Sequence, residues 1–294
     1  MTVTDAELSS LATTHDIIAL GMRADELRRQ RHGSNTTFVR VVDIPFDAEA
    51  AIAWPPGAGE IRIAGRPTSR TSAAPRVAAV IAAAGAIPVS AFSLADLEQL
   101  ASDERVPLRA ILEELRGAGL ELVAEAPLDL LQDARRSIEE VNIAGLALAR
   151  LTISKLPTTD VSSLLRRVAE LQRAVGVIRA FAPLPRRFNP ATPTTGFDDV
   201  KRVALARIVV DNVPSIQVDW SLYGPKLAQV ALTMGADDVD AVSAEDDTGQ
   251  GWRRAPLEEI RRNIQTAGFE PVERNGRFDV LTHAASAPDS RFHR

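Results

Sequence analysis

The sequence contains no cysteine among its 294 residues. This absence excludes disulfide bonds, and it excludes any metal or iron–sulfur site that needs a thiolate from this chain. Only four histidines occur, His15, His32, His283 and His293, and no two of them have the close spacing of zinc ligands. A histidine-rich zinc site is therefore not expected, and we predict no metal site.

Long apolar runs are also missing. The longest one, Val77–Val89, has about 13 residues and is interrupted by Pro88, which is too short to cross a bilayer. The first residues, Met1–Leu11, carry two acidic side chains and lack the apolar segment of a signal peptide. These features predict a cytoplasmic protein without a membrane span.

The charge is modest, with a formal net charge of −5 and 25% charged residues. A nucleic-acid partner is not expected, because binding to phosphates requires a basic face. Apolar residues make up 45% of the chain, which is enough for a large core. The length fits one large domain or two small ones.

Segments typical of strands alternate with segments typical of helices from about residue 36 onward, a pattern that predicts a parallel sheet. The predicted strands are Thr37–Ile44, Glu60–Ala64, Ile87–Phe92, Leu120–Ala124, Leu146–Ile153, Val177–Ala182, Ser215–Trp220 and Val239–Ser243. Eight such units and this length favour a closed (β/α)8 barrel of the TIM type. A doubly wound open sheet is the structural alternative.

The barrel is predicted to span residues 36–268, with a helical extension at 1–35. Asn275-Gly276 between two short apolar segments predicts a C-terminal β-hairpin, assigned to residues 269–283 and packed on the barrel. Residues 284–294 are expected to form a loose tail. The weakest part of the pattern is Phe46–Pro56, which offers barely a turn of helix after the first strand.

Three segments of the C-terminal half carry a resemblance to a known family: Ala206–Pro214 (ARIVVDNVP), Gly224–Lys226 (GPK) and Gly235–Asp240 (GADDVD). The chain resembles the radical-SAM enzymes of the futalosine route to menaquinone, aminofutalosine synthase and dehypoxanthinyl futalosine cyclase. The match is best from Ile178 to Leu281 and looser upstream. It implies a barrel fold and a role in or near menaquinone biosynthesis.

The sequence departs from that family at the cofactor site. The family holds an iron–sulfur cluster through a CxxxCxxC run near the N-terminus, and this chain has no cysteine. In the family, a pair of glycines docks the amino-acid end of S-adenosylmethionine. This chain has Gly65-Arg66 at that position, so Gly65 is interpreted as a vestige of that site. We therefore expect no cluster, no radical chemistry, no S-adenosylmethionine binding and no other cofactor.

Strand alternation predicts which side chains point into the barrel, since outward positions pack on helices and are apolar. In Ser215–Trp220, Gln217 and Asp219 are predicted to point inward. The same reasoning turns Arg150 inward, and it turns Arg62 and Arg66 inward from Glu60–Ala64 and its end. The interior is then expected to hold several arginines and few carboxylates.

Two interpretations of Arg150 stay open. Buried charges persist when they are paired, so Arg150 could form an internal ion pair, for example with Asp219. Alternatively, spare arginines could bind the carboxylate or phosphate of a ligand. The predicted ligand-binding set is Arg66, Arg150, Gln217, Asp219 and Glu245.

Carboxylates near the carboxyl ends of the strands are candidates for acid–base catalysis, because barrel enzymes keep their sites there. Glu245 matches a family carboxylate close to the substrate, and it is the predicted catalytic residue together with Asp219. Asp246 and Asp247 follow it in the sequence, and they could either have a surface role or bind Mg²⁺. Arg186-Arg187 could be a solvated loop or a lid over an anionic ligand.

Two functions compete at this point. The first is a cluster-free family member that binds a small anionic metabolite, as a non-radical enzyme or a binding protein. The second is a catalytically inactive scaffold subunit that forms a heteromer with an active homologue, or a homo-oligomer. A preserved polar interior would favour the first, and a large exposed apolar patch would favour the second.

Overall fold

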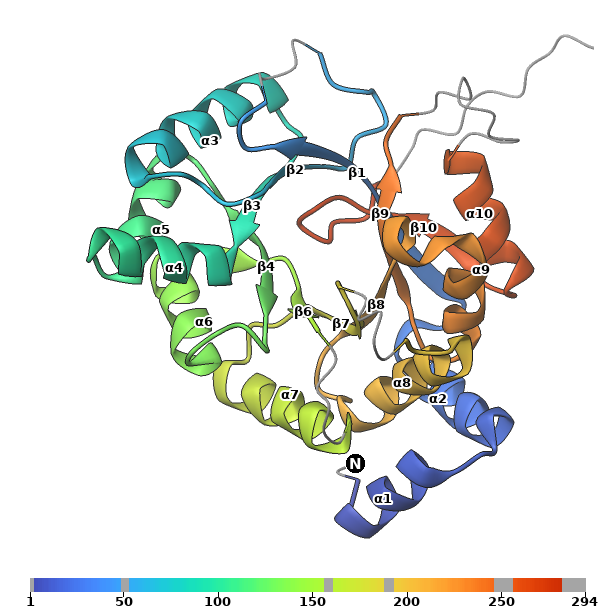
Figure 1. Ribbon diagram of the computed structural model, residues 1–294. Coiled ribbons are helices and arrows are strands. Elements are labelled where there is room, and N and C mark those ends of the chain that lie inside the picture. Colours follow the sequence, from blue (N-terminus) through green and yellow to red (C-terminus); the bar gives the residue numbers. More distant parts are fainter. Residues whose placement is uncertain (1–2, 49–52, 156–160, 188–192, 246–255, 282–294) are drawn as a thin grey trace, which may run out of the picture.

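The computed structural model describes residues 3–48, 53–155, 161–187, 193–245 and 256–281, and the following description is of these residues. Parallel strands form a closed ring with helices around it (Figure 1). The strands of the ring are β1 (Asn35–Pro45), β2 (Glu60–Ala64), β3 (Val89–Ser93), β4 (Leu122–Pro127), β5 (Ala147–Leu148), β6 (Leu151–Ile153), β7 (Ala180–Pro185), β8 (Ser215–Asp219) and β9 (Asp238–Ser243).

The ring closes because β9 pairs in parallel with β1, with Thr37 opposite Asp238 and Val41 opposite Ser243. This pairing confirms the closed barrel and is incompatible with an open doubly wound sheet. The fifth strand of the barrel is broken into β5 and β6, which both pair with β4. Arg150 is the second of the two residues in this break and directly precedes β6.

The helices of the ring are α3 (Arg70–Ala84), α4 (Leu94–Glu104), α5 (Leu108–Gly117), α6 (Ala134–Ile143), α7 (Val161–Val175), α8 (Gly196–Val209), α9 (Trp220–Thr233) and α10 (Pro256–Thr266). Helix α4 was not predicted, and it follows β3 without a loop. The described residues between β1 and β2 form turns and no helix, in agreement with the weak pattern there.

Two helices precede the barrel, α1 (Asp5–Thr13) and α2 (Ile17–His32), as predicted. Thr4 and Asp16 cap them by accepting hydrogen bonds from the backbone N–H groups of Glu7 and Ala19. Helix α2 packs outside the ring against α8 and α9. The extension therefore adds a layer to one flank of the barrel.

The C-terminal segment closes the amino end of the barrel. Strand β10 (Glu270–Glu273) pairs in parallel with the first residues of β1. The predicted hairpin is present only as a short turn, since its antiparallel pairing is a single bridge between Arg274 and Val280. In Figure 1 the loop after β10 lies inside the ring of strands. The predicted tail, residues 284–294, lies outside the described residues.

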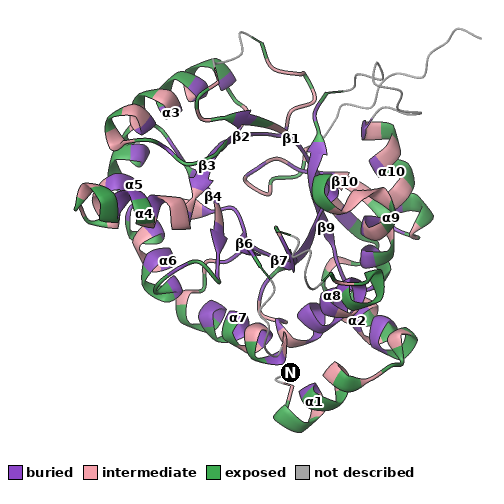
Figure 2. Cartoon of the chain, viewed as in Figure 1, coloured by how far each residue is buried: buried purple, intermediate pink, exposed green. Residues whose placement is uncertain are grey.

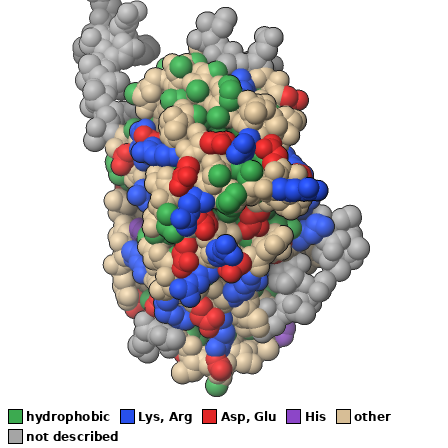
Figure 3. Space-filling model, turned by 90° about the vertical axis from the view of Figure 1, so that its left-hand side faces the viewer, with side chains coloured by type: hydrophobic (Ala, Val, Ile, Leu, Met, Phe, Trp, Pro, Cys, Tyr) green, Lys and Arg blue, Asp and Glu red, His purple; other side chains and the backbone are tan. Residues whose placement is uncertain are grey.

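Buried residues concentrate in the ring and on the inner faces of the helices (Figure 2). On the side of α3 to α6, basic and acidic side chains are interspersed (Figure 3), with ion pairs such as Arg135–Glu139 and Arg109–Glu140. Within the described ranges, no helix combines the length and the apolar character needed to cross a bilayer.

Candidate functional site

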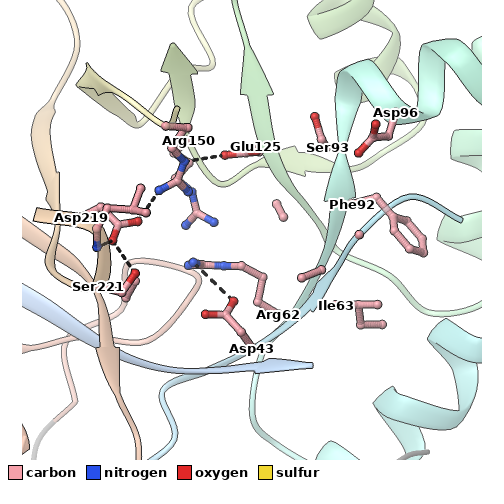
Figure 4. A pocket seen from close by; sticks show the side chains of 16 residues that line it. Asp43, Arg62, Ile63, Phe92, Ser93, Asp96, Glu125, Arg150, Asp219 and Ser221 are labelled. Carbon is pink, nitrogen blue, oxygen red and sulfur yellow. Dashed lines mark hydrogen bonds and ion pairs between the residues drawn. The ribbon is translucent and has the colours of Figure 1, made fainter. Parts of the chain in front are cut away.

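A cavity of about 320 Å³ opens at the carboxyl end of the barrel, within the size range of small-molecule sites. Figure 4 shows its labelled side chains pointing into one space from opposite sides of the ring. Its lining comprises Asp43, Arg62, Ile63, Ala64, Gly65, Phe92, Ser93, Asp96, Ala124, Glu125, Arg150, Arg186, Asp219, Ser221, Leu222 and Ala241. The position matches the face at which barrel enzymes carry their sites.

The floor of the cavity is an ion-pair cluster around Asp240. Nη2 of Arg62 donates to Asp240 Oδ1 at 2.9 Å, and Nη1 of Arg150 lies 2.8 Å from Asp240 Oδ2. Burial alone would raise the pKa of Asp240, but the two guanidinium groups outweigh it and hold that pKa well below its ordinary range. The two guanidinium groups therefore favour the ionised form of Asp240.

Arg62 is the most fully paired cation of the floor. Besides Asp240, it donates from Nε to Glu60 Oε1 at 3.1 Å, and its Nη1 lies 3.8 Å from Asp43. Glu60 also accepts a hydrogen bond from Ser90 at 2.5 Å. Burial opposes the charge of Arg62, but its carboxylate neighbours raise its pKa well above the ordinary value. Its Nε and Nη2 are thus engaged by buried carboxylates, and Nη1 has only the longer ion-pair contact with Asp43.

Arg150 is different, because its charge is undercompensated. It is 2% exposed and its Nε has no hydrogen-bond partner in the described structure. Its pKa is lowered, first by burial and then by repulsion from Arg62. A buried donor without a partner is costly, and a buried arginine that lines a cavity can recover this cost by binding an anionic group.

The upper wall is held together by Arg186. Its Nε donates to Glu125 Oε2 at 3.0 Å, and its Nη1 donates to Asp219 Oδ2. Burial would raise the pKa of Glu125, but Arg186 and Arg150 lower it below its ordinary value. The sequence allows a solvated loop or a lid at Arg186, and the structure instead places this side chain inward, as a wall of the cavity.

Asp219 also stabilises the start of helix α9. It caps α9 by accepting hydrogen bonds from the backbone N–H of Leu222 at 2.9 Å and from the hydroxyl of Ser221 at 2.7 Å. It lines the cavity, where strand alternation predicts it. Its partner is Arg186 and not Arg150, so the ion pair suggested between Arg150 and Asp219 is not formed.

The structure brings only part of the predicted set together. Gly65 lines the cavity with a φ of +91°, beside Arg150 and Asp219. Arg66 turns to the surface and pairs with Asp103, because β2 ends at Ala64 and the alternation stops there. Gln217 points into the barrel below the cavity and donates to Asp238 at 2.6 Å.

Glu245 is exposed and does not line the cavity. The backbone N–H of Glu245 donates to the hydroxyl of Ser243, which turns the chain outward after β9. The neighbouring Asp246 and Asp247 lie outside the described residues. The predicted catalytic pair is thus not assembled, since Asp219 and Glu245 do not face the same space.

The expected excess of arginine is wrong. Carboxylates in the bore match or outnumber guanidinium groups, because β1, β2, β4 and β9 supply acidic side chains that the alternation argument did not consider. Among the charged side chains that line the cavity or belong to the ion pairs below it, the acids are Asp43, Glu60, Asp96, Glu125, Asp219, Asp238 and Asp240, against Arg62, Arg150, Arg186 and Arg274. The motif Gly235–Asp240 contained the signal, since its alternate residues Asp238 and Asp240 point inward.

Two cavity-lining residues hold backbone conformations that only glycine adopts freely. Phe92 has φ +61° at the end of β3, and Ala241 has φ +57° within β9. Such strain persists where surrounding structure enforces it, and it is frequent at functional sites. At Ala241 it also breaks the alternation, which is why β9 presents both Asp240 and Ala241 to the bore.

Comparisons with known proteins agree with this architecture. Residues 184–287 match the model of the CofH/MqnC C-terminal region. The aminodeoxyfutalosine synthase of Thermus thermophilus is 26% identical, over 90% of this chain and 88% of that enzyme. The cyclic dehypoxanthine futalosine synthase of Streptomyces coelicolor is 28% identical, over 58% of this chain and 47% of that enzyme.

The chain is thus similar in sequence to futalosine synthases. Solved structures support the fold at lower identity. Methylornithine synthase superposes with a TM-score of 0.66 and 13% identity, covering 92% of this chain and 94% of that one. The FeFe-hydrogenase maturase HydG from Carboxydothermus hydrogenoformans gives a TM-score of 0.63 at 11% identity, covering 92% of this chain and 76% of that one.

The cluster of radical-SAM enzymes does not fit this relative. Cluster irons are held by cysteine thiolates, and the sequence has none at any position. The charged lining of the cavity consists of arginines and carboxylates, most of which bind each other. No step that depends on an iron–sulfur cluster is therefore assigned to these residues.

Proposed function

We propose that this protein binds a small metabolite with an anionic group in the cavity at the carboxyl end of the barrel. It acts there as a cluster-free relative of the futalosine-pathway enzymes, in or near menaquinone biosynthesis in the cytoplasm, without radical chemistry. The observation that carries the proposal is Arg150, a fully buried cavity-lining guanidinium whose Nε has no partner. An anionic oxygen of a ligand at the cavity-facing part of this guanidinium group would balance its undercompensated charge.

The proposal is tested by a thermal-shift screen of futalosine-pathway intermediates. A ligand that binds the folded state alone raises the melting temperature by mass action. We expect one or more acidic intermediates to stabilise the wild-type protein. A screen in which none does so would remove the link to this pathway.

We predict that the purified protein stays colourless and free of iron after anaerobic reconstitution with iron and sulfide. The reason is the donor set, since even clusters with two histidine ligands keep cysteine thiolates on the other iron, and this chain has no cysteine. Iron and sulfide analysis together with the visible spectrum measures this. Stoichiometric iron and sulfide with a charge-transfer band would contradict it.

We predict that S-adenosylmethionine binds weakly or not at all. Of the Gly65-Arg66 pair, only Gly65 lines the cavity, and no cluster iron is available to anchor the amino-acid end of this molecule. Titration calorimetry gives the answer. A dissociation constant in the low micromolar range would overturn the prediction and favour a nucleoside site or methyl transfer.

The scaffold function remains a second candidate because of α2. Ile18 and Met22 lie one turn apart on this helix and are 73% and 69% exposed. Exposed apolar side chains of this kind are available for a protein partner. Native mass spectrometry after co-expression with an active homologue distinguishes the two functions, since only the scaffold requires a heteromer.

A further inference from the structure

Asp96 is a cavity-lining carboxylate whose charge nothing nearby neutralises by contact. It lies in the first turn of α4, half-buried, at the side of the cavity formed by β3. In the described part of the chain no hydrogen bond or ion pair reaches its side chain. Burial raises its pKa, Glu125 raises it further, and only the more distant Arg66 and Arg187 oppose this effect. Figure 4 shows it across the cavity from Arg150 and Asp219.

The other carboxylates of the cavity are already engaged. Glu125 and Asp219 share Arg186, while Asp43 lies 3.8 Å from Arg62. A ligand with only negative charge would pair with Arg150, but it would also bring that charge close to the unpaired carboxylate of Asp96. Like charges brought together in this way cost binding energy.

We infer that the ligand of this cavity is amphoteric, with a carboxylate or phosphate held by Arg150 and an ammonium group held by Asp96. This inference rests on the proposed function and specifies the chemistry of its ligand. The ammonium group gives Asp96 the donors that the protein does not supply. Charges of both signs at opposite sides of the cavity also fix the orientation of the bound molecule.

A metal ion is a poorer occupant for Asp96. Divalent cations need several oxygen ligands at once. Among the described residues, no group of three or more acidic or histidine side chains has the arrangement that could hold a metal ion. An organic cation needs one carboxylate.

The probes are ω-amino carboxylates, from glycine to 8-aminooctanoate, and the alkanoates that lack only their amino group. Binding to the whole protein is measured by ligand-observed NMR. We expect one chain length to bind best, and to bind about three- to tenfold more tightly than its matched alkanoate, the scale of a half-exposed charged hydrogen bond. Asp96→Asn should abolish this preference, and the alkanoates should bind at least as tightly as to the wild type because their repulsion from Asp96 is removed.

Glu139→Gln is the control, because it removes an equal charge from an exposed ion pair on α6, outside the cavity. It should leave the preference unchanged. Equal affinities for both probe series, an unaffected preference in Asp96→Asn, or no binding of any amino carboxylate would overturn the amphoteric ligand. If one of these results is found but Arg150→Met still weakens acid binding, the proposed site stands and only the amphoteric ligand is wrong. If Arg150→Met leaves every acid bound as before, the proposed site itself is wrong.

Discussion

Arg150→Met should weaken binding of the acidic ligand by roughly 10- to 150-fold, which corresponds to the 1.5–3 kcal/mol of a charged hydrogen bond. Methionine keeps most of the side-chain volume and removes the charge. Calorimetry with the ligand found in the screen measures the effect. Affinity that stays within about twofold of wild type would contradict a role of Arg150 in binding.

The same substitution should cost little stability. Asp240 keeps its contact with Arg62 at 2.9 Å, so no buried carboxylate loses all its partners. Repulsion between Arg62 and Arg150 also disappears. We therefore expect a loss well below the roughly 3–5 kcal/mol of a broken buried pair. A loss of that full size in denaturant unfolding would show that Arg150 serves the internal network instead.

Arg274→Met should lower the free energy of unfolding by about 3–5 kcal/mol, because it breaks a buried pair at the other end of the bore. Arg274 is 2% exposed and binds both oxygens of Asp238, at 2.6 and 2.7 Å. Without it, Asp238 keeps only the neutral donors of Thr37 and Gln217. An uncompensated buried carboxylate would remain.

Arg277→Met is the matched control for this effect. Arg277 lies three residues further along and pairs with Glu121, but both side chains of that pair are more than 40% exposed. Its removal should cost no more than about 1 kcal/mol. Urea unfolding of the two variants side by side decides the matter. Similar losses in both would contradict the structural role assigned to the Arg274–Asp238 pair.

Much of the fold was predictable, because alternation of apolar and polar residues is strong in the outward-packed strands. Ile216 and Val218 pack outward in β8, and this fixes Gln217 and Asp219 inward. Helix α4 escaped prediction because no turn residue separates it from β3. Asn275-Gly276 does form a turn, as the sequence predicts. The preceding strand β10, however, pairs in parallel with the first residues of β1 and does not extend into an antiparallel hairpin.

The site was predictable where the alternation of inward and outward side chains holds. Arg150 and Asp219 lie in the cavity as alternation requires, although Arg150 falls in the break between β5 and β6, whereas Arg66 lies two residues beyond the end of β2 and leaves the bore. Arg186 follows β7 in a segment that reads as a basic loop. Its inward position depends on Glu125 and Asp219, which come from two other strands. Contacts between side chains of strands that are distant in the sequence form only when the ring closes, so no local sequence pattern predicts them.

The central claim is that the cavity at the carboxyl end of the barrel is the ligand site. A crystal structure of the protein with the best ligand from the screen tests it most directly. We predict electron density for the ligand in this cavity, with an anionic oxygen within hydrogen-bond distance of the Arg150 guanidinium group. A ligand bound elsewhere, or bound in the cavity without contact to this guanidinium group, would contradict the proposed site.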